Sequence, residues 1–247
     1  MERKNYWLIL LFLILHGISA AGDFKQEIYR AYISGEMQDW KKVVDQMERN
    51  KQNEPGFLID LINYEYGYIG WCLGSDRKDE AENCLDLAEE NLEKLDNLTN
   101  KYTAEIHAYT AAFYGFKIGL KNWRAPFLGP KSVDHAEKAL ELDPDNFNAN
   151  MEMGNIWSNM PELFGGSDEK ALKHYKKALE VLEQKSAEEL KNNWMFLNLL
   201  ALIGQTEQRL GNYEKARRYF EKALKIEPRF LWVKNELLPS LLKELNE

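Results

Sequence analysis

The sequence has few of the residues that most often perform chemistry. Its 247 residues include four histidines and two cysteines. It has no Gly-x-Ser-x-Gly turn, no phosphate-binding glycine loop, no Cys-x-x-Cys pair and no His-Glu-x-x-His helix. These are the patterns of common hydrolases, nucleotide-binding proteins, redox proteins and zinc peptidases. We therefore expect no catalytic residue, no cofactor and no enzyme activity.

The few histidines show no metal-ligand pattern. His135 and His174 stand four residues before Ala139 and Ala178, which are equivalent positions in the repeat described below. Neighbouring helices lie about 8–10 Å apart, whereas a shared metal needs each imidazole nitrogen within about 2 Å. No third ligand has a matching spacing, so we predict no metal site.

Basic residues are also in the minority, and no apolar run is long. The formal net charge is −8, and nucleic acid is not an expected partner because it requires a clustered basic face. The apolar run from Tyr6 to Leu15 is about half of the roughly 20 residues that cross a bilayer.

Residues 1–21 have the pattern of a secretory signal peptide. A charged start precedes the apolar run, and a small-residue end, His16–Ala21, follows it. We predict cleavage after Ala20 or Ala21, with retention as a membrane anchor as the alternative. The mature chain is then periplasmic or secreted and has no transmembrane segment. No cysteine stands at the junction, so no lipid anchor is expected.

Cys72 and Cys84 lie twelve residues apart. In an exported protein a disulfide would persist, and two cysteines on the antiparallel helices of one hairpin could form it. Two buried thiols are the alternative, and the spacing does not decide between them.

The alternation typical of strands is absent over any useful length, and a helical repeat is present instead. The clearest unit, Phe196–Pro228, has Gly204 followed at intervals of twelve, four, three and five residues by Ala216, Phe220, Ala223 and Pro228. Small residues let two helices cross closely, and a proline ends the second helix. With a glycine and a capping asparagine in its turn, this segment resembles a tetratricopeptide repeat.

Two preceding units repeat this pattern with a longer turn. In the first of these units the pattern residues are Gly115, Ser132 and Ala136. In the second unit they are Gly154, Ala171 and Tyr175, each 39 positions later. The inserted segments, 122–130 and 159–166, carry aromatic residues between Pro and Gly. We interpret them as turns whose apolar side chains either pack on the stack or meet a partner.

Weaker signals extend the repeat in both directions. Gly70 precedes Ala81 by eleven residues, and Ala31 precedes Val43 by twelve. The capping-box pattern Ser186–Glu189 predicts a long helix from there to Arg209. The leucine-rich tail predicts a terminal helix that covers the last repeat.

The predicted fold is therefore all-α. It is a right-handed superhelical stack of about five helical hairpins, a tetratricopeptide-like α-solenoid, with a capping helix at 230–246. The repeat domain spans 22–247, with hairpins at about 23–50, 57–95, 103–143, 147–184 and 187–227.

The resemblance implies a concave groove lined by the first helix of each hairpin. In this family the lining residues lie six and three before, and one and four after, the small mid-helix residue. This rule gives one aromatic half and one amide half, and from it we predict as partner-binding residues Tyr64, Trp71, Tyr109, Phe116, Asn148, Met151, Asn155, Ser158, Asn198, Gln205 and Gln208. The alternative is that the aromatic residues are packing and the amides are merely solvated.

These features predict an exported scaffold without enzyme activity that binds a protein or peptide segment in the groove. The alternative is small-molecule binding, because Pro161–Ala171 is similar to turns in the periplasmic T-component of tripartite ATP-independent transporters. An apolar pocket closed by Trp123, Phe127 and Phe164 would favour the small molecule. An open groove would favour the peptide.

Overall fold

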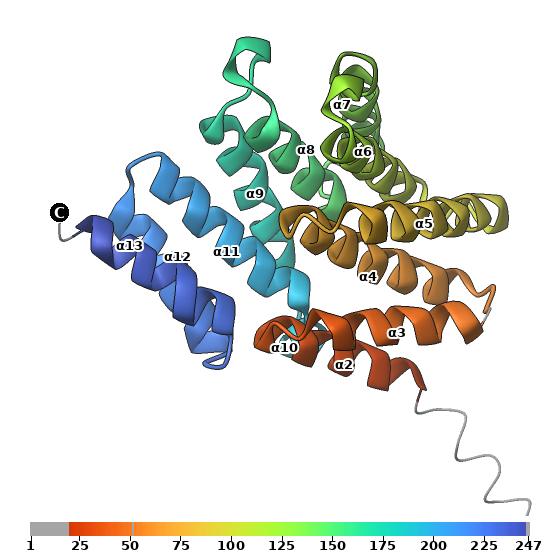
Figure 1. Cartoon of the computed structure of the whole chain (residues 1–247), viewed down its shortest axis with the longest axis horizontal. Coiled ribbons are helices and arrows are strands. Elements are labelled where there is room, and N and C mark those ends of the chain that lie inside the picture. Colours follow the sequence, from red (N-terminus) through yellow and green to blue (C-terminus); the bar gives the residue numbers. More distant parts are fainter. Residues whose placement is uncertain (1–19, 51, 246–247) are drawn as a thin grey trace, which may run out of the picture.

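The computed structural model describes residues 20–50 and 52–245, so nearly all of the predicted signal peptide lies outside the described residues. Within them the chain folds into packed helices and contains no strand (Figure 1). The all-α prediction is confirmed. The helices pair into hairpins: α2 (Ala20–Ser34) with α3 (Met37–Asn50), α4 (Pro55–Gly74) with α5 (Lys78–Leu98), α6 (Thr103–Leu120) with α7 (Ala125–Leu142), α8 (Phe147–Asn159) with α9 (Asp168–Glu183), and α11 (Trp194–Arg209) with α12 (Tyr213–Ile226).

Turn and cap residues set the limits of these helices. Gly35 and Gly211 adopt φ values of 72° and 74°, in the left-handed region that glycine reaches without strain. Asn146, Ser167 and Asn193 each accept a backbone hydrogen bond at the start of α8, α9 and α11. These bonds satisfy amide groups that a helix leaves unpaired at its N-terminus.

Within two hairpins, a glycine of the first helix faces an aromatic ring of the second. A Cβ placed on Gly204 would lie 2.3 Å from the ring of Phe220, and one on Gly154 would lie 2.4 Å from the ring of Tyr175. Both rings are buried. The predicted close crossings at these two glycines are confirmed.

Gly70 and Gly115 do not have this role, although the spacing predicts it. A Cβ on either would meet no atom within 4 Å. In the second hairpin the buried residue twelve positions before Ala81 is Ile69. The twelve-residue interval of the last repeat therefore holds there, and the register based on Gly70 is wrong by one residue.

The segment 122–130 is largely helical and not a loop. It contains a short 3-10 turn, η1 (Asn122–Arg124), and then the first residues of α7. Pro126 lies in the first turn of α7, where its missing amide hydrogen has no helical partner to lose. The second insertion is an irregular turn, with a single 3-10 turn η2 (Glu162–Phe164) and Gly165 at φ 96°.

The predicted helix from Ser186 to Arg209 is broken. The capping box forms, but it caps only the single turn α10 (Ala187–Leu190). Asn192 then adopts φ 54°, and α11 starts anew with Asn193 as its cap.

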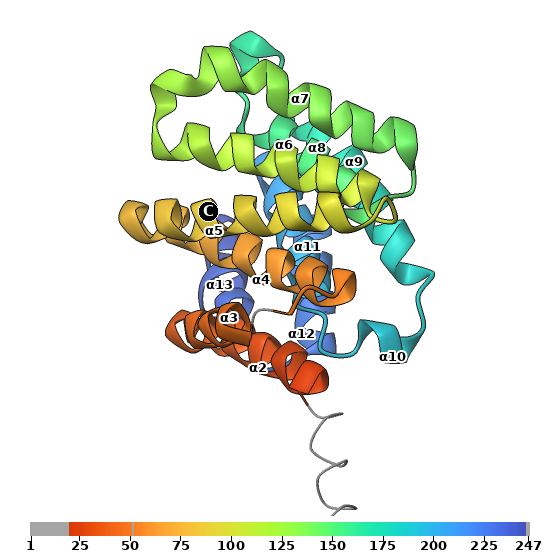
Figure 2. The same cartoon turned by 90° about the vertical axis from the view of Figure 1, so that its right-hand side faces the viewer.

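The C-terminal segment packs against α12, as predicted for a capping helix (Figure 2). It consists of a π-helical turn, η3 (Val233–Leu237), followed by α13 (Leu238–Leu245). Pro239 has no amide hydrogen to donate to the carbonyl of the residue four positions earlier, which is consistent with irregular hydrogen bonding at this point.

The stack curves until its two ends meet. Helix α11 of the last hairpin contacts α2 of the first, and the ring of Tyr32 on α2 lies 5.1 Å from that of Phe230, which follows α12. The hydroxyl of Tyr32 donates a hydrogen bond of 3.0 Å to Asn198 Oδ1. Of the described helices, none is both long and apolar enough to cross a bilayer.

Candidate functional site

An aromatic cluster closes one end of the inner face, the surface that α4, α6, α8 and α11 turn toward the centre of the stack. The indole rings of Trp40 and Trp194 meet edge to face with centroids 5.0 Å apart. Tyr32 packs on both rings, and Trp40 Nε1 donates to the carbonyl of Tyr64 at 2.8 Å. A Cβ on Gly67 would lie 2.6 Å from Trp40 and 2.9 Å from Trp194. We call Tyr32, Trp40, Tyr64 and Trp194 the closure cluster.

A chain of hydrogen bonds leads from this cluster along the inner face. Trp194 Nε1 donates to Asn63 Oδ1 at 2.9 Å, and Asn63 Nδ2 donates to the Tyr109 hydroxyl at 3.0 Å. The ring of Tyr109 lies 5.8 Å from that of Tyr66. Polar side chains thus join α11, α4 and α6 in the interior. A buried polar group there needs a hydrogen-bond partner.

Asn155 of α8 continues this network. Its Oδ1 accepts a 2.8 Å hydrogen bond from the Tyr175 hydroxyl, and its Nδ2 lies 3.1 Å from both the Tyr66 hydroxyl and Glu152 Oε1. Burial raises the pKa of Glu152 to about 7, and hydrogen bonds with Tyr66 and Asn155 oppose that rise. A network of this kind, in a low-dielectric interior, fixes how the helices sit against one another.

These contacts correct part of the predicted groove. Tyr64, Tyr109 and Met151 are buried, so the prediction that they line an open surface is wrong. Asn155 and Asn198 are half-buried and form hydrogen bonds within the chain. The reason is the closure of the stack, which brings the first helices close enough for their inner side chains to pack against one another.

The wrong register on α4 accounts for the positions of Tyr64 and Trp71. Tyr64 packs against Trp40 of α3. Trp71 packs on Tyr68, one turn earlier on α4, and the guanidinium of Arg77 lies over its ring. The groove rule applied to Ile69 instead yields the positions Asn63, Tyr66, Gly70 and Leu73. Asn63 and Tyr66 were therefore missed, although the twelve-residue interval to Ala81 could have identified them.

The inner-face residues near the C-terminal ends of the first helices are only partly buried. Phe116, Ser158 and Gln205, all predicted, are half-buried there. Leu73 is half-buried and lies 3.4 Å from a Cβ placed on Gly119, whereas Gly70 is exposed with free space around it. The Ser158 hydroxyl accepts a 2.8 Å hydrogen bond from Arg209, which ties α8 to α11. We call these five inner-face positions the mouth: Gly70, Leu73, Phe116, Ser158 and Gln205.

Two predicted residues lie elsewhere. Gln208 donates a 2.7 Å hydrogen bond to Glu244 of α13, so the C-terminal helix holds it. Asn148 is half-buried near the start of α8, at the other end of that helix from Ser158.

The sulfur atoms form no bond with each other. Cys72 and Cys84 are free and buried, so the structure has two thiols where the sequence left a disulfide open. Burial raises the pKa of both thiols, that of Cys72 to about 11.

The histidines pair differently from the arrangement considered above. His135 meets His107 across the α6–α7 hairpin, with their Nδ1 atoms 2.9 Å apart, while His174 lies 3.4 Å from Asn150. The described residues contain no group of three or more His, Cys, Asp or Glu side chains able to hold a metal ion.

The aromatic residues of the two inserted segments do not close a pocket. Trp123, Phe127 and Phe164 are all exposed. These three residues therefore do not form the apolar pocket that would favour small-molecule binding.

Fold and inner face together define an all-α helical-repeat protein whose stack closes on itself. Residues 198–230 match the family model of the tetratricopeptide repeat. The match covers α11 from Asn198 onward, the following turn and all of α12. A comparison with curated proteins found no match. A tetratricopeptide repeat supports a general role in protein interaction, because stacked repeats present extended surfaces to partners.

Proposed function

We propose that this protein is an exported, non-enzymatic scaffold that binds a protein segment at the mouth of its inner face. The observation that supports the proposal most directly is the contrast between the two ends of that face. One end is filled by the closure cluster, and the other presents half-buried apolar and amide side chains beside an exposed glycine.

The chemistry of the mouth suits a peptide chain. The Gln205 amide can both donate to and accept from a peptide backbone, while Phe116 and Leu73 offer apolar contact area. Gly70 leaves free space beside them, so a partner's backbone can approach α4 closely.

Export is part of the proposal, supported by the pattern of residues 1–21. The first described side chain that is buried is Phe24. Cleavage after Ala20 or Ala21 would therefore leave every described core residue in the mature chain.

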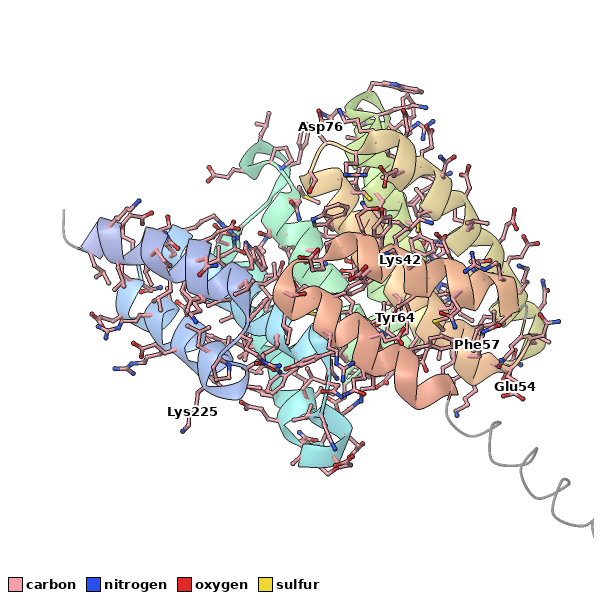
Figure 3. The ribbon with its side chains drawn as sticks, turned by 60° about the horizontal axis from the view of Figure 1, so that its bottom comes forward. Lys42, Glu54, Phe57, Tyr64, Asp76 and Lys225 are labelled. Atoms are coloured by element: carbon pink, nitrogen blue, oxygen red, sulfur yellow. The ribbon has the colours of Figure 1, made fainter. Side chains whose placement is uncertain are left out.

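A blocking variant tests the binding site. Gly70→Arg places a long side chain in the mouth, and Gly56→Arg places the same side chain at the opposite end of α4, where a Cβ also meets no atom within 4 Å. Figure 3 labels Phe57 near the start of α4 and Asp76 in the turn that follows its end. The protein is used as bait in affinity capture from the envelope and secreted fractions of its own organism.

The expected result is a protein retained by the wild type and by Gly56→Arg and lost by Gly70→Arg, with unchanged helix content in all three. A partner that Gly70→Arg retains fully would overturn the mouth as the binding site. Capture of no protein by any bait would overturn the scaffold function.

A further inference from the structure

The most exposed apolar side chains gather on two neighbouring tips. Trp123 and Phe127 of the α6–α7 tip are 69% and 68% exposed, and Leu163 and Phe164 of the α8–α9 tip are 88% and 73% exposed. All other large apolar side chains of the described chain are at most 53% exposed. Both tips lie in the upper part of the molecule in Figures 1 and 2. Such a concentration of apolar surface marks an interaction site.

The charge of the first tip is opposite to that of the whole protein. The chain carries −8 overall but has no Asp or Glu between Glu105 and Asp134. Four cations lie in this interval: Lys117, Lys121, Arg124 and Lys131. The segment that forms this tip is therefore basic, although the protein is acidic overall.

Two of these cations form salt bridges with α5, and the other two form cation–π contacts. Lys117 and Lys121 pair with Glu89 and Glu82 of α5. Arg124 and Lys131 form no salt bridge with any described residue and instead lie over the rings of Trp123 and Tyr114, at 5.6 and 5.9 Å.

The tips project outward and are built on stiff backbone. Pro126 and Pro130 lie within the first turns of α7, and Pro161 precedes the 3-10 turn that carries Leu163 and Phe164. Proline fixes φ and limits the conformations lost on docking. Aromatic rings next to cations on a protruding edge are the arrangement that enters the boundary between lipid headgroups and acyl chains.

We propose that the α6–α7 and α8–α9 tips dock this protein on the surface of an anionic phospholipid bilayer. Trp123, Phe127, Leu163 and Phe164 enter the headgroup boundary, and Arg124 and Lys131 meet lipid phosphates. A bilayer accepts separate apolar projections without a complementary pocket, whereas a protein partner would have to supply one for each tip. The second tip contributes apolar contact alone, because its exposed Glu162 opposes anionic headgroups. This inference does not depend on the protein-binding function.

An environment-sensitive fluorophore on an introduced thiol reports docking at the tip itself. Cys72 and Cys84 are buried, so labelling is confined to Phe127→Cys, Phe164→Cys or a control, Leu98→Cys, at the end of α5. The full chain is mixed with vesicles of equal parts phosphatidylcholine and phosphatidylglycerol, or of phosphatidylcholine alone. We expect a blue shift of both tip probes with the anionic vesicles, a smaller shift with neutral vesicles, and none at Leu98→Cys.

Charge reversal tests the electrostatic part. Arg124→Glu with Lys131→Glu is expected to weaken vesicle binding about tenfold or more. Lys215→Glu with Arg218→Glu, which changes the net charge equally on exposed positions of α12, is expected to leave binding intact. An unshifted tip probe, an equal shift at Leu98→Cys, or equal effects of the two reversals would each overturn the proposal. The probe at Leu98 separates tip docking from any binding by residues 1–21.

Discussion

Trp40 and Trp194 join the first helical hairpin to the last, with their ring centroids 5.0 Å apart at an interplanar angle of 82°. Edge-to-face indoles combine a large buried apolar area with favourable ring electrostatics. The contact decides the shape of the inner face, because it closes the end at which α4 and α11 approach each other.

Removing this contact should strongly destabilise the protein. For Trp194→Ala we expect a loss of about 3–5 kcal/mol in the free energy of unfolding, as for other buried aromatic truncations, since its hydrogen bond to Asn63 is lost as well. The matched control is Trp123→Ala, which removes an exposed indole and should change stability by no more than about 0.5 kcal/mol. Urea titration followed by circular dichroism measures both. Similar midpoint shifts for the two variants would show that the closure cluster is not a stabilising contact.

Two glycines should respond to alanine in opposite directions. Gly204→Ala places a Cβ 2.3 Å from the buried ring of Phe220, and we expect a loss of about 1–3 kcal/mol from overpacking. Gly70→Ala meets no atom within 4 Å, and alanine in a helix should add about 0.5–1 kcal/mol. The thermal midpoints of the two variants, measured against the wild type, should move to opposite sides. Two shifts of the same sign would contradict the assignment of Gly204 as the helix crossing and Gly70 as free surface.

Glu152 should make stability depend on pH. Its pKa is raised from 4.5 to about 7, so over that interval the folded chain holds a proton that the unfolded chain has released. The stability contributed by the protonated carboxyl is present below about 4.5 and is lost as the pH rises through about 7. Burial of the charged form at higher pH costs up to about 3 kcal/mol.

The variant Glu152→Gln isolates this effect, because the neutral amide keeps the size and hydrogen bonds of the protonated acid. We expect it to match the wild type near about pH 5 and to be more stable by up to about 3 kcal/mol near about pH 8. Other buried groups, including Glu65, titrate equally in both proteins and cancel in the difference. A constant difference across this range, measured by urea unfolding, would show that Glu152 does not titrate there.

The cysteines should be unreactive in the folded protein. Both thiols are buried and burial raises both pKa values, and the thiolate is the reactive form. Maleimide should add to neither cysteine in native buffer and to both in denaturant, as counted by mass spectrometry. A folded protein with Cys72 and Cys84 linked in one disulfide-bonded peptide would refute the two-thiol state.

Export predicts a defined N-terminus. When the full chain is produced in a bacterial host, the protein recovered from the periplasm should begin at Ala21 or Gly22 by N-terminal sequencing. Ile9→Arg with Leu13→Arg interrupts the apolar run and should leave the chain uncleaved inside the cell, because charges are costly in an apolar signal segment. An uncleaved wild-type chain in the membrane fraction would instead support the membrane anchor.

The sequence was most informative where a local rule governed the structure. Gly204 and Phe220 predicted a helix crossing, and the structure has it. The rule failed for Gly70, because glycine is common both at crossings and on free surfaces, and the spacing alone was off by one residue. It also failed between Ser186 and Arg209, where a correct capping box caps only one turn.

The amino-acid sequence by itself determined the helices, most of their limits and their pairing into hairpins, because caps, turns and close crossings depend on residues near one another in the chain. Only the tertiary structure decided that the stack closes, that Tyr109 and Asn155 belong to an internal network, that the mouth is half-buried and that the apolar side chains of the two tips are exposed. The degree of closure depends on small angles between successive hairpins, which add up along the stack. The contact that completes it, Trp40 against Trp194, joins residues too distant in the sequence for any spacing rule to connect.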